Sequence, residues 1–329
     1  MFHIPDKNIF TINSDKEFST LALRIFKYQA IENPVYQNYI KNLKLNPEEI
    51  DSVDTIPFLP IRFFKSTPII SGHAKAKLVF SSSGTTGLGT SKHHVVNPAI
   101  YEESLLKSFR LSYGQPSKYD FLALLPSYFE QTGSSLLYMV KYLMQESNGN
   151  HSGFYLNNLS KLADKIAYLK NNSSRKIFII GVSFALLDLA EQFAPDLSST
   201  IVMETGGMKG RRKEITREEL HKVLCEKFNL PHIHSEYGMT ELLSQAYSKR
   251  KGKFYPPPWM RIKIRDPYDP FHFLKSGKTG ILNLIDLANI YSCSFIETDD
   301  LGRRHDDNSF EVLGRFDHSD IRGCNLMVN

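Results

Sequence analysis

Hydrophobic positions along this chain form a helical stripe near the N-terminus and then a series of short apolar runs. Ser14 and Glu17 have the spacing of a capping box, and apolar residues follow at helical intervals from Phe18 to Phe26. Most of the later runs lead through a polar loop into a helical pattern, and such repeats predict a largely parallel sheet with helices on both faces. The runs of strand length lie at residues 77–80, 121–125, 176–180, 200–203 and 232–234.

From residue 261 onward the pattern changes to short alternating stretches, at residues 261–264, 280–285, 294–296 and 310–313. Alternation with period two is typical of half-buried strands. We therefore expect an α/β fold with an α/β core over residues 1–260 and a smaller β-rich region over residues 261–329. The core should contain largely parallel sheets flanked by helices. Ligands of such folds collect at the carboxyl ends of the strands, where the glycine-rich loops of this chain also fall.

The composition is that of a globular protein without a strong charge bias. The 40 basic and 35 acidic residues leave a net charge of +5, spread along the chain, which does not indicate nucleic-acid binding. No apolar run reaches the length of a membrane span, and the N-terminus lacks a basic-then-apolar leader. The 3 cysteines are widely spaced and favour neither a disulfide framework nor a zinc site, so we expect a cytoplasmic protein with free thiols.

One loop, from Ser82 to Lys92, combines hydroxyls and glycines with a closing lysine directly after an apolar strand. Converging backbone N–H groups in such a loop form an anion-binding nest, which suits a polyphosphate. The glycine spacing is that of a Walker loop, but Thr90 stands where that motif has its lysine. Besides Lys92, the residues of this loop that we predict to bind phosphate are Ser82, Ser83, Gly84, Thr85, Thr86 and Gly87.

Three more motifs follow along the chain. Residues 237–241 supply an aromatic ring, a glycine, a hydroxyl and a carboxylate, residues 298–302 read as an acidic turn after a strand, and residues 314–317 read Gly-Arg-Phe-Asp. Each motif alone is weak. Together with the loop, and in this order, they resemble the core motifs of the adenylate-forming enzymes, the acyl- and aryl-CoA ligase superfamily. The fold would then be similar to the large N-terminal domain of those enzymes.

This resemblance implies an enzyme that uses ATP and Mg²⁺. The loop with Lys92 would hold the β- and γ-phosphates, and Thr240 would bind the α-phosphate. Glu241 would hold Mg²⁺, which binds one or two carboxylates plus phosphates. Tyr237 would stack on the base with its flat ring, and Asp300 would bind the ribose, although Asp299 replaces the family's glycine. The complete set implied for the nucleoside is Gly206, Gly207, Tyr237, Gly238, Asp300 and Arg315.

Further residues resemble one subfamily, the acyl-protein synthetases of the LuxE type. They lie in residues 56–65, 91–93, 204–210 and 321–324, and the chain ends at residue 329, where other adenylate-forming enzymes continue into another domain. In the LuxE type, a cysteine near the C-terminus accepts the acyl group, and Cys324 is the matching position. Arg315 and Arg322 lie close in sequence and would favour its thiolate. We expect Cys225 and Cys293 to lie in the core.

The implied enzyme is a ligase, a long-chain-fatty-acid–protein ligase. It would activate a fatty or other carboxylic acid as an acyl-adenylate and transfer the acyl group to Cys324 as a thioester. An acyl-reductase protein would be its partner. We expect the acyl pocket to be lined by Tyr128, Phe129, Ser134 and Ser135.

Other functions stay open at this point. An acyl- or aryl-CoA ligase of the phenylacetate type would share the same loops and pass the acyl group to CoA. A serine hydrolase or acyltransferase is a weaker alternative, because Gly181 to Ala185 resembles a nucleophile elbow around Ser183. In the simpler interpretation, Ser183 only caps a helix. A scaffold that does not bind ATP is the third possibility.

Overall fold

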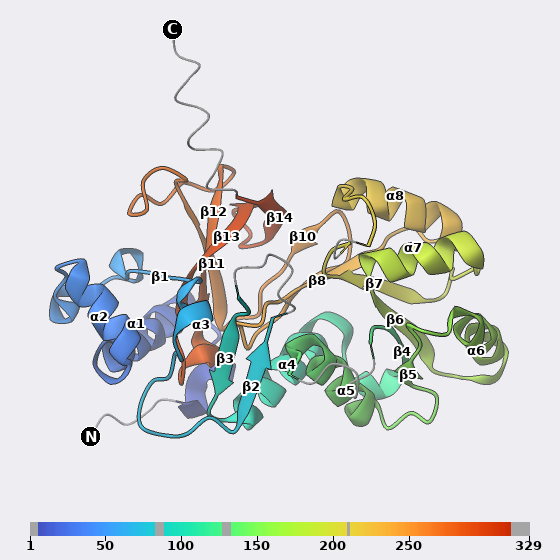
Figure 1. Ribbon diagram of the computed structural model, residues 1–329, viewed down its shortest axis with the longest axis horizontal. Helices are drawn as coiled ribbons and strands as arrows, with labels where there is room; N and C mark the ends of the chain where they lie inside the picture. The colour runs from blue at the N-terminus through green and yellow to red at the C-terminus, as the bar shows by residue number, and fades with distance from the viewer. Residues whose placement is uncertain (1–5, 83–88, 127–132, 209–210, 317–329) are drawn as a thin grey trace, which may run out of the picture. The chain divides into compact units, whose positions relative to one another are not determined.

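The computed structural model describes residues 6–82, 89–126, 133–208 and 211–316, and its contacts divide the chain into two compact units (Figure 1). The continuous unit is Ala74–Pro257. The discontinuous unit combines Met1–His73 with Pro258–Asn329. No helix in the described parts of the chain is long and apolar enough to cross a membrane.

The continuous unit alternates strands and helices, as the apolar runs predict. Its strands are β2 (Leu78–Ser81), β3 (Lys92–Val95), β4 (Tyr119–Leu124), β5 (Gly153–Phe154), β6 (Lys176–Val182), β7 (Ile201–Thr205), β8 (His234–Tyr237), β9 (Ala246–Ser248) and β10 (Lys253–Phe254). Its helices are α4 (Pro98–Tyr113), η4 (Pro116–Lys118), α5 (Ser135–Ser147), α6 (Leu159–Asn172), α7 (Ser183–Gln192) and α8 (Arg217–Phe228).

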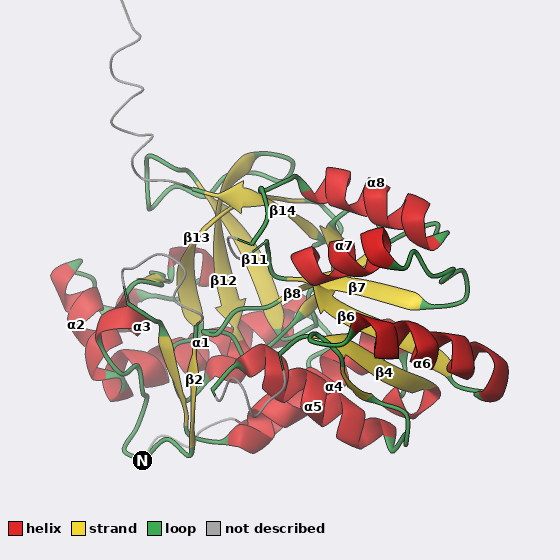
Figure 2. Ribbon diagram, turned by 45° about the vertical axis from the view of Figure 1, so that its right-hand side comes forward, coloured by secondary structure: helices red, strands yellow, loops and turns green. Residues whose placement is uncertain are grey.

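The main sheet of this unit has the order β5-β4-β6-β7-β8-β9. Neighbouring strands from β5 to β8 are parallel, and β9 is antiparallel to β8. Figure 2 shows α7 and α8 along one face and α4 and α5 along the other. Strand β4 is buried at every position, as expected for a parallel strand covered on both faces. A capping box of Thr216 and Glu219 starts α8.

The discontinuous unit joins N-terminal helices to an antiparallel sheet. Its N-terminal elements are η1 (Asp6–Thr11), α1 (Asp15–Glu32), α2 (Pro34–Asn42), η2 (Pro47–Glu49), η3 (Val53–Thr55), β1 (Leu59–Pro60) and α3 (Phe63–Ser66). Its C-terminal elements are β11 (Met260–Arg265), β12 (Thr279–Asp286), η5 (Leu287–Asn289), β13 (Phe295–Arg304) and β14 (Phe310–Arg315). Strands β11 to β14 pair in sequence order and antiparallel, and β1 pairs parallel with β13.

Two expectations about the fold need correction. Largely parallel pairing holds for strands β5 to β8 of the expected core, but β2 and β3 of the same core pair antiparallel. Residues 298–302 also belong to the interior of the long strand β13 and not to a turn. Their polar side chains suggest a turn in the sequence, but a strand near the surface tolerates the same residues.

The compact units also divide the chain differently from the expected domains 1–260 and 261–329. The buried Gln29 of α1 donates from Nε2 to the carbonyl oxygens of Asn289 and Ile290, at 3.0 Å each. Asn33 donates from Nδ2 to the carbonyl oxygen of Ser292 at 2.8 Å. The ring of Tyr36 stacks on Phe295 with centroids 6.3 Å apart. These buried contacts group the N-terminal helices with the β-rich region.

Candidate functional site

The glycine-rich loop of the continuous unit is held closed at its base. Strands β2 and β3 pair antiparallel, with Ser81 opposite Lys92. The N–H of Ser82 donates to the carbonyl oxygen of Ser91 at 3.0 Å, and the N–H of Ser91 donates back to Ser82 Oγ at 2.9 Å. Lys92 is exposed where the loop ends. The predicted phosphate-binding residues inside the loop lie outside the described residues: Ser83, Gly84, Thr85, Thr86 and Gly87.

A buried histidine connects this loop to the turn that follows β8. His93, next to Lys92, places Nδ1 3.0 Å from the carbonyl oxygen of Thr240. Burial lowers the pKa of His93 to about 4, so its ring is neutral at pH 7 and Nδ1 carries the hydrogen that the carbonyl accepts. Thr240 is half-buried, and Glu241 beside it is buried. The structure thus brings the Lys92 strand together with the turn that carries Thr240 and Glu241.

The glycines after β7 lie at the same carboxyl edge of the parallel sheet. Gly206 and Gly207 are both exposed, and Gly206 has φ +69°, a conformation that side chains disfavour. Among the described residues, nothing would lie within 4 Å of a Cβ at Gly207. Open space beside the backbone at this edge suits the close approach of a flat ligand.

Ser183 bonds to the backbone beside these glycines. It has neither of the two roles considered from the sequence, those of a nucleophile and of a helix cap. Its hydroxyl donates to the carbonyl oxygen of Gly206 at 2.9 Å, and the residue is only 3% exposed. It is the first residue of α7, and the N-cap position is occupied by Val182, so Ser183 is not the helix cap. A buried hydroxyl that is engaged with a backbone carbonyl is a poor candidate for a nucleophile, so the structure does not favour the hydrolase alternative.

Tyr237 and Gly238 continue the turn after β8. The ring of Tyr237 is buried and lies 5.9 Å from that of Phe254, centroid to centroid. Its hydroxyl donates to Met239 Sδ at 3.6 Å. Gly238 is exposed. Stacking of Tyr237 on a base stays a prediction, since no base is present in the structure.

Sequence reasoning missed two acidic side chains at the ends of β7 and β8. Glu204 lies 3.0 Å from Arg217 Nε and 3.6 Å from His221 Nε2. Burial alone would raise the pKa of Glu204, but the hydrogen bond with His221 and the charge of Arg217 hold it below its usual value. Glu236 accepts a hydrogen bond at Oε2 from Thr205 Oγ1 at 2.6 Å. The sequence signal was only an acid directly before Tyr237.

The expected acyl-pocket residues are only partly described. Tyr128 and Phe129 lie outside the described residues. Ser134 caps α5 through its hydroxyl, which accepts from the N–H of Leu137 at 3.4 Å, and the carbonyl oxygen of Ser135 accepts from the Tyr101 hydroxyl at 3.0 Å. These contacts give both serines a structural role, and pocket lining stays a prediction.

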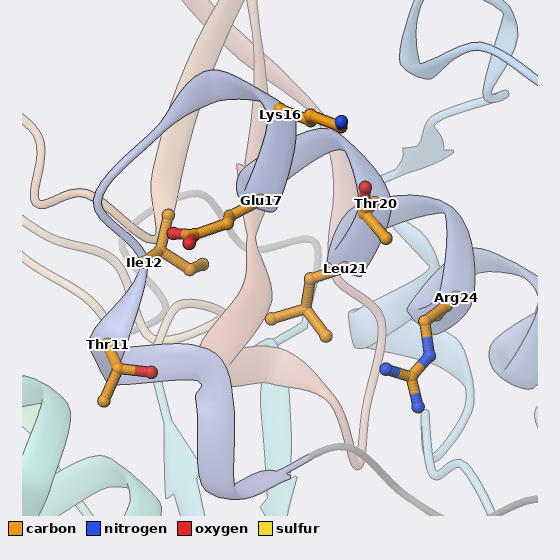
Figure 3. Close-up of a pocket in the computed structure, with 7 residues that line it drawn as sticks. All are labelled: Thr11, Ile12, Lys16, Glu17, Thr20, Leu21 and Arg24. Carbon is orange, nitrogen blue, oxygen red and sulfur yellow. The ribbon is translucent and has the colours of Figure 1, made fainter.

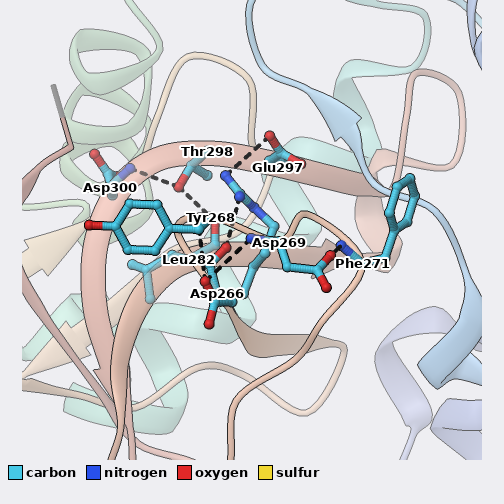
Figure 4. A network of polar contacts seen from close by, with 9 residues as sticks. Asp266, Tyr268, Asp269, Phe271, Leu282, Glu297, Thr298 and Asp300 are labelled. Atoms are coloured by element: carbon cyan, nitrogen blue, oxygen red, sulfur yellow. Dashed lines mark hydrogen bonds and ion pairs between the residues drawn. The ribbon is translucent and has the colours of Figure 1, made fainter. Parts of the chain in front are cut away.

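Asp300 and Arg315 belong to the discontinuous unit and are directly paired across β13 and β14. Arg315 Nε lies 3.6 Å from Asp300 Oδ1. The N–H of Asp300 donates to Thr298 Oγ1 at 3.0 Å, and that hydroxyl donates to the carbonyl oxygen of Leu282 at 2.7 Å (Figure 4). Thr298 therefore fixes the backbone from which the Asp300 side chain projects.

Two of the cysteines are described, and both are unsuited to nucleophilic attack. Burial raises the pKa of Cys293 to about 12, and burial also raises the pKa of Cys225. A thiol needs to ionise to attack, so neither is activated. Cys324, the predicted acyl acceptor, lies outside the described residues.

A surface pocket of about 480 Å³ lies on η1 and α1 of the discontinuous unit (Figure 3). The side chains that line it are Thr11, Ile12, Lys16, Glu17, Thr20, Leu21 and Arg24. It contains none of the residues predicted to bind ATP or the acyl group. Across the described residues, no group of three or more His, Cys, Asp or Glu side chains is arranged to hold a metal ion.

Residues 135–329, more than half of the chain, match the model of the LuxE acyl-protein synthetase family. The chain belongs to this family. A curated relative, the long-chain-fatty-acid–luciferin-component ligase of Vibrio harveyi, is 21% identical over 94% of this chain and 87% of its own length.

Solved structures place the LuxE-family chain in the adenylate-forming fold. A 2-hydroxyisobutyryl-CoA ligase solved with 2-HIB-AMP and CoA has a TM-score of 0.71 at 13% identity, over 95% of this chain and 71% of that one. ATP-bound MatB from Rhodopseudomonas palustris has a TM-score of 0.55 at 17% identity, over 74% of this chain. The match covers only about half of MatB, 49% of its length.

Proposed function

We propose that this chain activates a carboxylic acid with MgATP and transfers the acyl group to its own Cys324. In the first step, a carboxylate oxygen of the acid attacks the α-phosphorus of ATP. The bond to the bridging oxygen breaks, and pyrophosphate leaves. In the second step, the Cys324 thiolate attacks the acyl carbonyl of the adenylate, which forms a thioester and releases AMP.

The observation that carries this proposal is the bond between His93 and the Thr240 carbonyl. It joins the strand after the glycine-rich loop to the turn with Thr240 and Glu241. Two segments that are 147 residues apart in sequence are thereby held next to each other. Adenylation depends mainly on such positioning and on opposing the charge that develops on pyrophosphate. Lys92 would supply positive charge for that purpose.

The residues at this edge also suit a nucleotide-bound magnesium ion. Mg²⁺ usually binds one or two protein carboxylates together with phosphate oxygens and water, and Glu241 offers one carboxylate next to Thr240. When bound, the ion would neutralise charge on the phosphates. Thr240 would donate a hydrogen bond to the α-phosphate, and Gly206 and Gly207 would lie against the adenine. Binding of the ribose by Asp300 and binding of ATP by Arg315 stay predictions.

For the acid, we propose a long-chain fatty acid, because the Vibrio relative is named for that substrate. An acyl-reductase protein would then take the acyl group from the thioester. A CoA thioester is the second candidate product, since the 2-hydroxyisobutyryl-CoA ligase with the same fold was solved with CoA.

The test is acid-dependent exchange of labelled pyrophosphate into ATP across a panel of acids that varies in chain length and polarity. Exchange with at least one acid supports adenylation, and best exchange with long-chain acids supports the fatty-acid assignment. Exchange with none overturns the proposal. Rapid formation of an acyl-CoA without acylated protein would favour the CoA-ligase alternative.

A further inference from the structure

Glu236 sits where the two proposed ligand-binding turns meet. It lies near the end of β8, one residue before Tyr237, and its Oε2 accepts from Thr205 Oγ1 at the end of β7 at 2.6 Å. Thr205 directly precedes Gly206 and Gly207. One hydrogen bond therefore connects the turn after β7 to the turn after β8.

The other carboxyl oxygen of Glu236 lies against the backbone of the second turn. A Cβ at residue 238 would collide with Glu236 Oε1, and Gln245 Cγ would lie 3.5 Å from the same Cβ. Thr205 holds Oε2, so the carboxyl cannot swing away without losing that bond. Glycine at position 238 therefore leaves the room that this carboxyl occupies.

Titratable groups on β7, α4 and β9 interact electrostatically with Glu236. Glu204 lies on β7, Tyr101 on α4, and Tyr247 on β9 directly opposite Glu236. The charge of Glu204 is countered by Arg217 and His221 of α8. Tyr247 is buried, and no hydrogen-bond partner of its hydroxyl is found among the described residues.

These surroundings disfavour a negative charge on Glu236. Burial raises the pKa of Glu236 to about 7, the Thr205 hydrogen bond opposes this rise, and the Glu204 carboxylate adds to it. An ionised Glu236 would also repel the anionic phosphates and carboxylate that we propose to bind at this edge. The neutral carboxyl can connect the two turns without that repulsion.

We propose that Glu236 is a positioning residue of the adenylation reaction. Its protonated carboxyl holds the Gly206–Gly207 turn and the Gly238 turn in the relative position that binds substrate. This inference rests on the proposed function. Ionisation of Glu236 at alkaline pH weakens binding of the anionic substrates and lowers the exchange rate. The hydrogen bond from Thr205 lowers the pKa of Glu236 and so sets the pH at which this loss begins.

The experiment measures pyrophosphate exchange from pH 6 to 9, with kcat and KM for ATP, in the parent and in two variants. Glu236→Gln imitates the protonated carboxyl and carries no titratable group. Its exchange rate should equal that of the parent at pH 6 and should not fall above about pH 7. Thr205→Val has a similar shape but lacks the donor. In this variant the exchange rate should begin to fall at a higher pH than in the parent, because the hydrogen bond from Thr205 lowers the pKa of Glu236.

Glu226→Gln, an exposed acid on α8, is the control and should keep the parent profile. An unchanged alkaline fall in Glu236→Gln overturns the inference while leaving the proposed function intact. So does a Gln variant that has lost exchange at every pH, because a neutral carboxyl would then be insufficient. If the parent shows no exchange with any acid, the proposed function fails and the positioning role fails with it.

Discussion

Asp300 and Arg315 occupy directly paired positions on β13 and β14, and their side chains approach to 3.6 Å. The Arg315 side chain is 73% exposed, whereas that of Asp300 is 14% exposed. Exposed ion pairs of this kind contribute little to stability, about 0–1 kcal/mol. The pairing therefore matters more for orienting the Asp300 carboxylate than for holding the sheet together.

The first prediction concerns the ribose contact. Asp300→Ala should weaken ATP binding by roughly 1.5–3 kcal/mol, the range for a hydrogen bond to a charged group. Asp299 is the matched control, because adjacent strand residues point to opposite faces and Asp299 is exposed. Calorimetric titration with ATP measures both variants. A large loss in Asp299→Ala with none in Asp300→Ala would mean that the assignment is wrong by one residue.

The second prediction concerns magnesium. Glu241→Gln removes the carboxylate charge but keeps the shape of the side chain. Acid-dependent pyrophosphate exchange should fall by about two to three orders of magnitude, as expected for the loss of a main charge-stabilising group. Glu226→Gln should leave exchange unchanged. If Glu241→Gln shows nearly the exchange rate of the parent at low Mg²⁺, Glu241 does not bind the metal.

The third prediction separates the two half-reactions at Cys324. Cys324→Ala should keep pyrophosphate exchange but take up no label from radioactive fatty acid. Label on the parent should resist acid and be released by neutral hydroxylamine, as a thioester is.

Cys225→Ala and Cys293→Ala are the controls for that labelling. Both should still be labelled, and Cys293→Ala should lower the melting temperature because it leaves a small cavity at a fully buried position. Stable labelling of Cys324→Ala would place the acyl acceptor elsewhere.

The fourth prediction is a pH dependence of stability that arises from His93. Its pKa is about 4 in the folded protein and 6.5 in the unfolded chain. The unfolded state thus takes up a proton first, so the stabilising effect is complete above pH 6.5 and is lost as the pH falls toward 4. For one proton the slope of the unfolding free energy reaches at most about 1.4 kcal/mol per pH unit.

His93→Asn can still donate to the Thr240 carbonyl but does not titrate, so denaturant unfolding at pH 7 and 5 should show a smaller acid loss. Part of the loss should persist, because burial also lowers the pKa of His234 to about 4. An acid loss equal to that of the parent would show that His93 is already protonated in the folded protein.

Local patterns allowed much of the continuous unit to be predicted from the sequence. The Ser14 cap, whose hydroxyl accepts from the N–H of Glu17, and the buried runs of β4 and β6 are short-range signals, and they are found as expected. The family was also identified correctly from the ordered motifs. The roles of the individual site residues stay predictions.

What could not be predicted depends on distant contacts. Gln29 is a polar residue within an apolar helical stripe, and nothing local indicates that it bonds to Asn289. Glu236 looks like any acid beside a turn, because its burial comes from β7, β9 and α4. The Asp299–Asp300 pair suggested a turn, whereas pairing with β12 and β14 keeps the segment extended. In each case tertiary packing overrides a local preference.

The division of one compact unit between the two ends of the chain has a consequence for how the protein is made. During synthesis, α1 and α2 emerge first, but Phe295, against which Phe26 and Tyr36 pack, is added only after the whole continuous unit. All of the continuous unit has been synthesised by residue 257, before the partner of these aromatic rings exists. We therefore expect nascent chains that end before residue 295 to expose the apolar faces of α1 and α2, the kind of surface that aggregates and that chaperones bind.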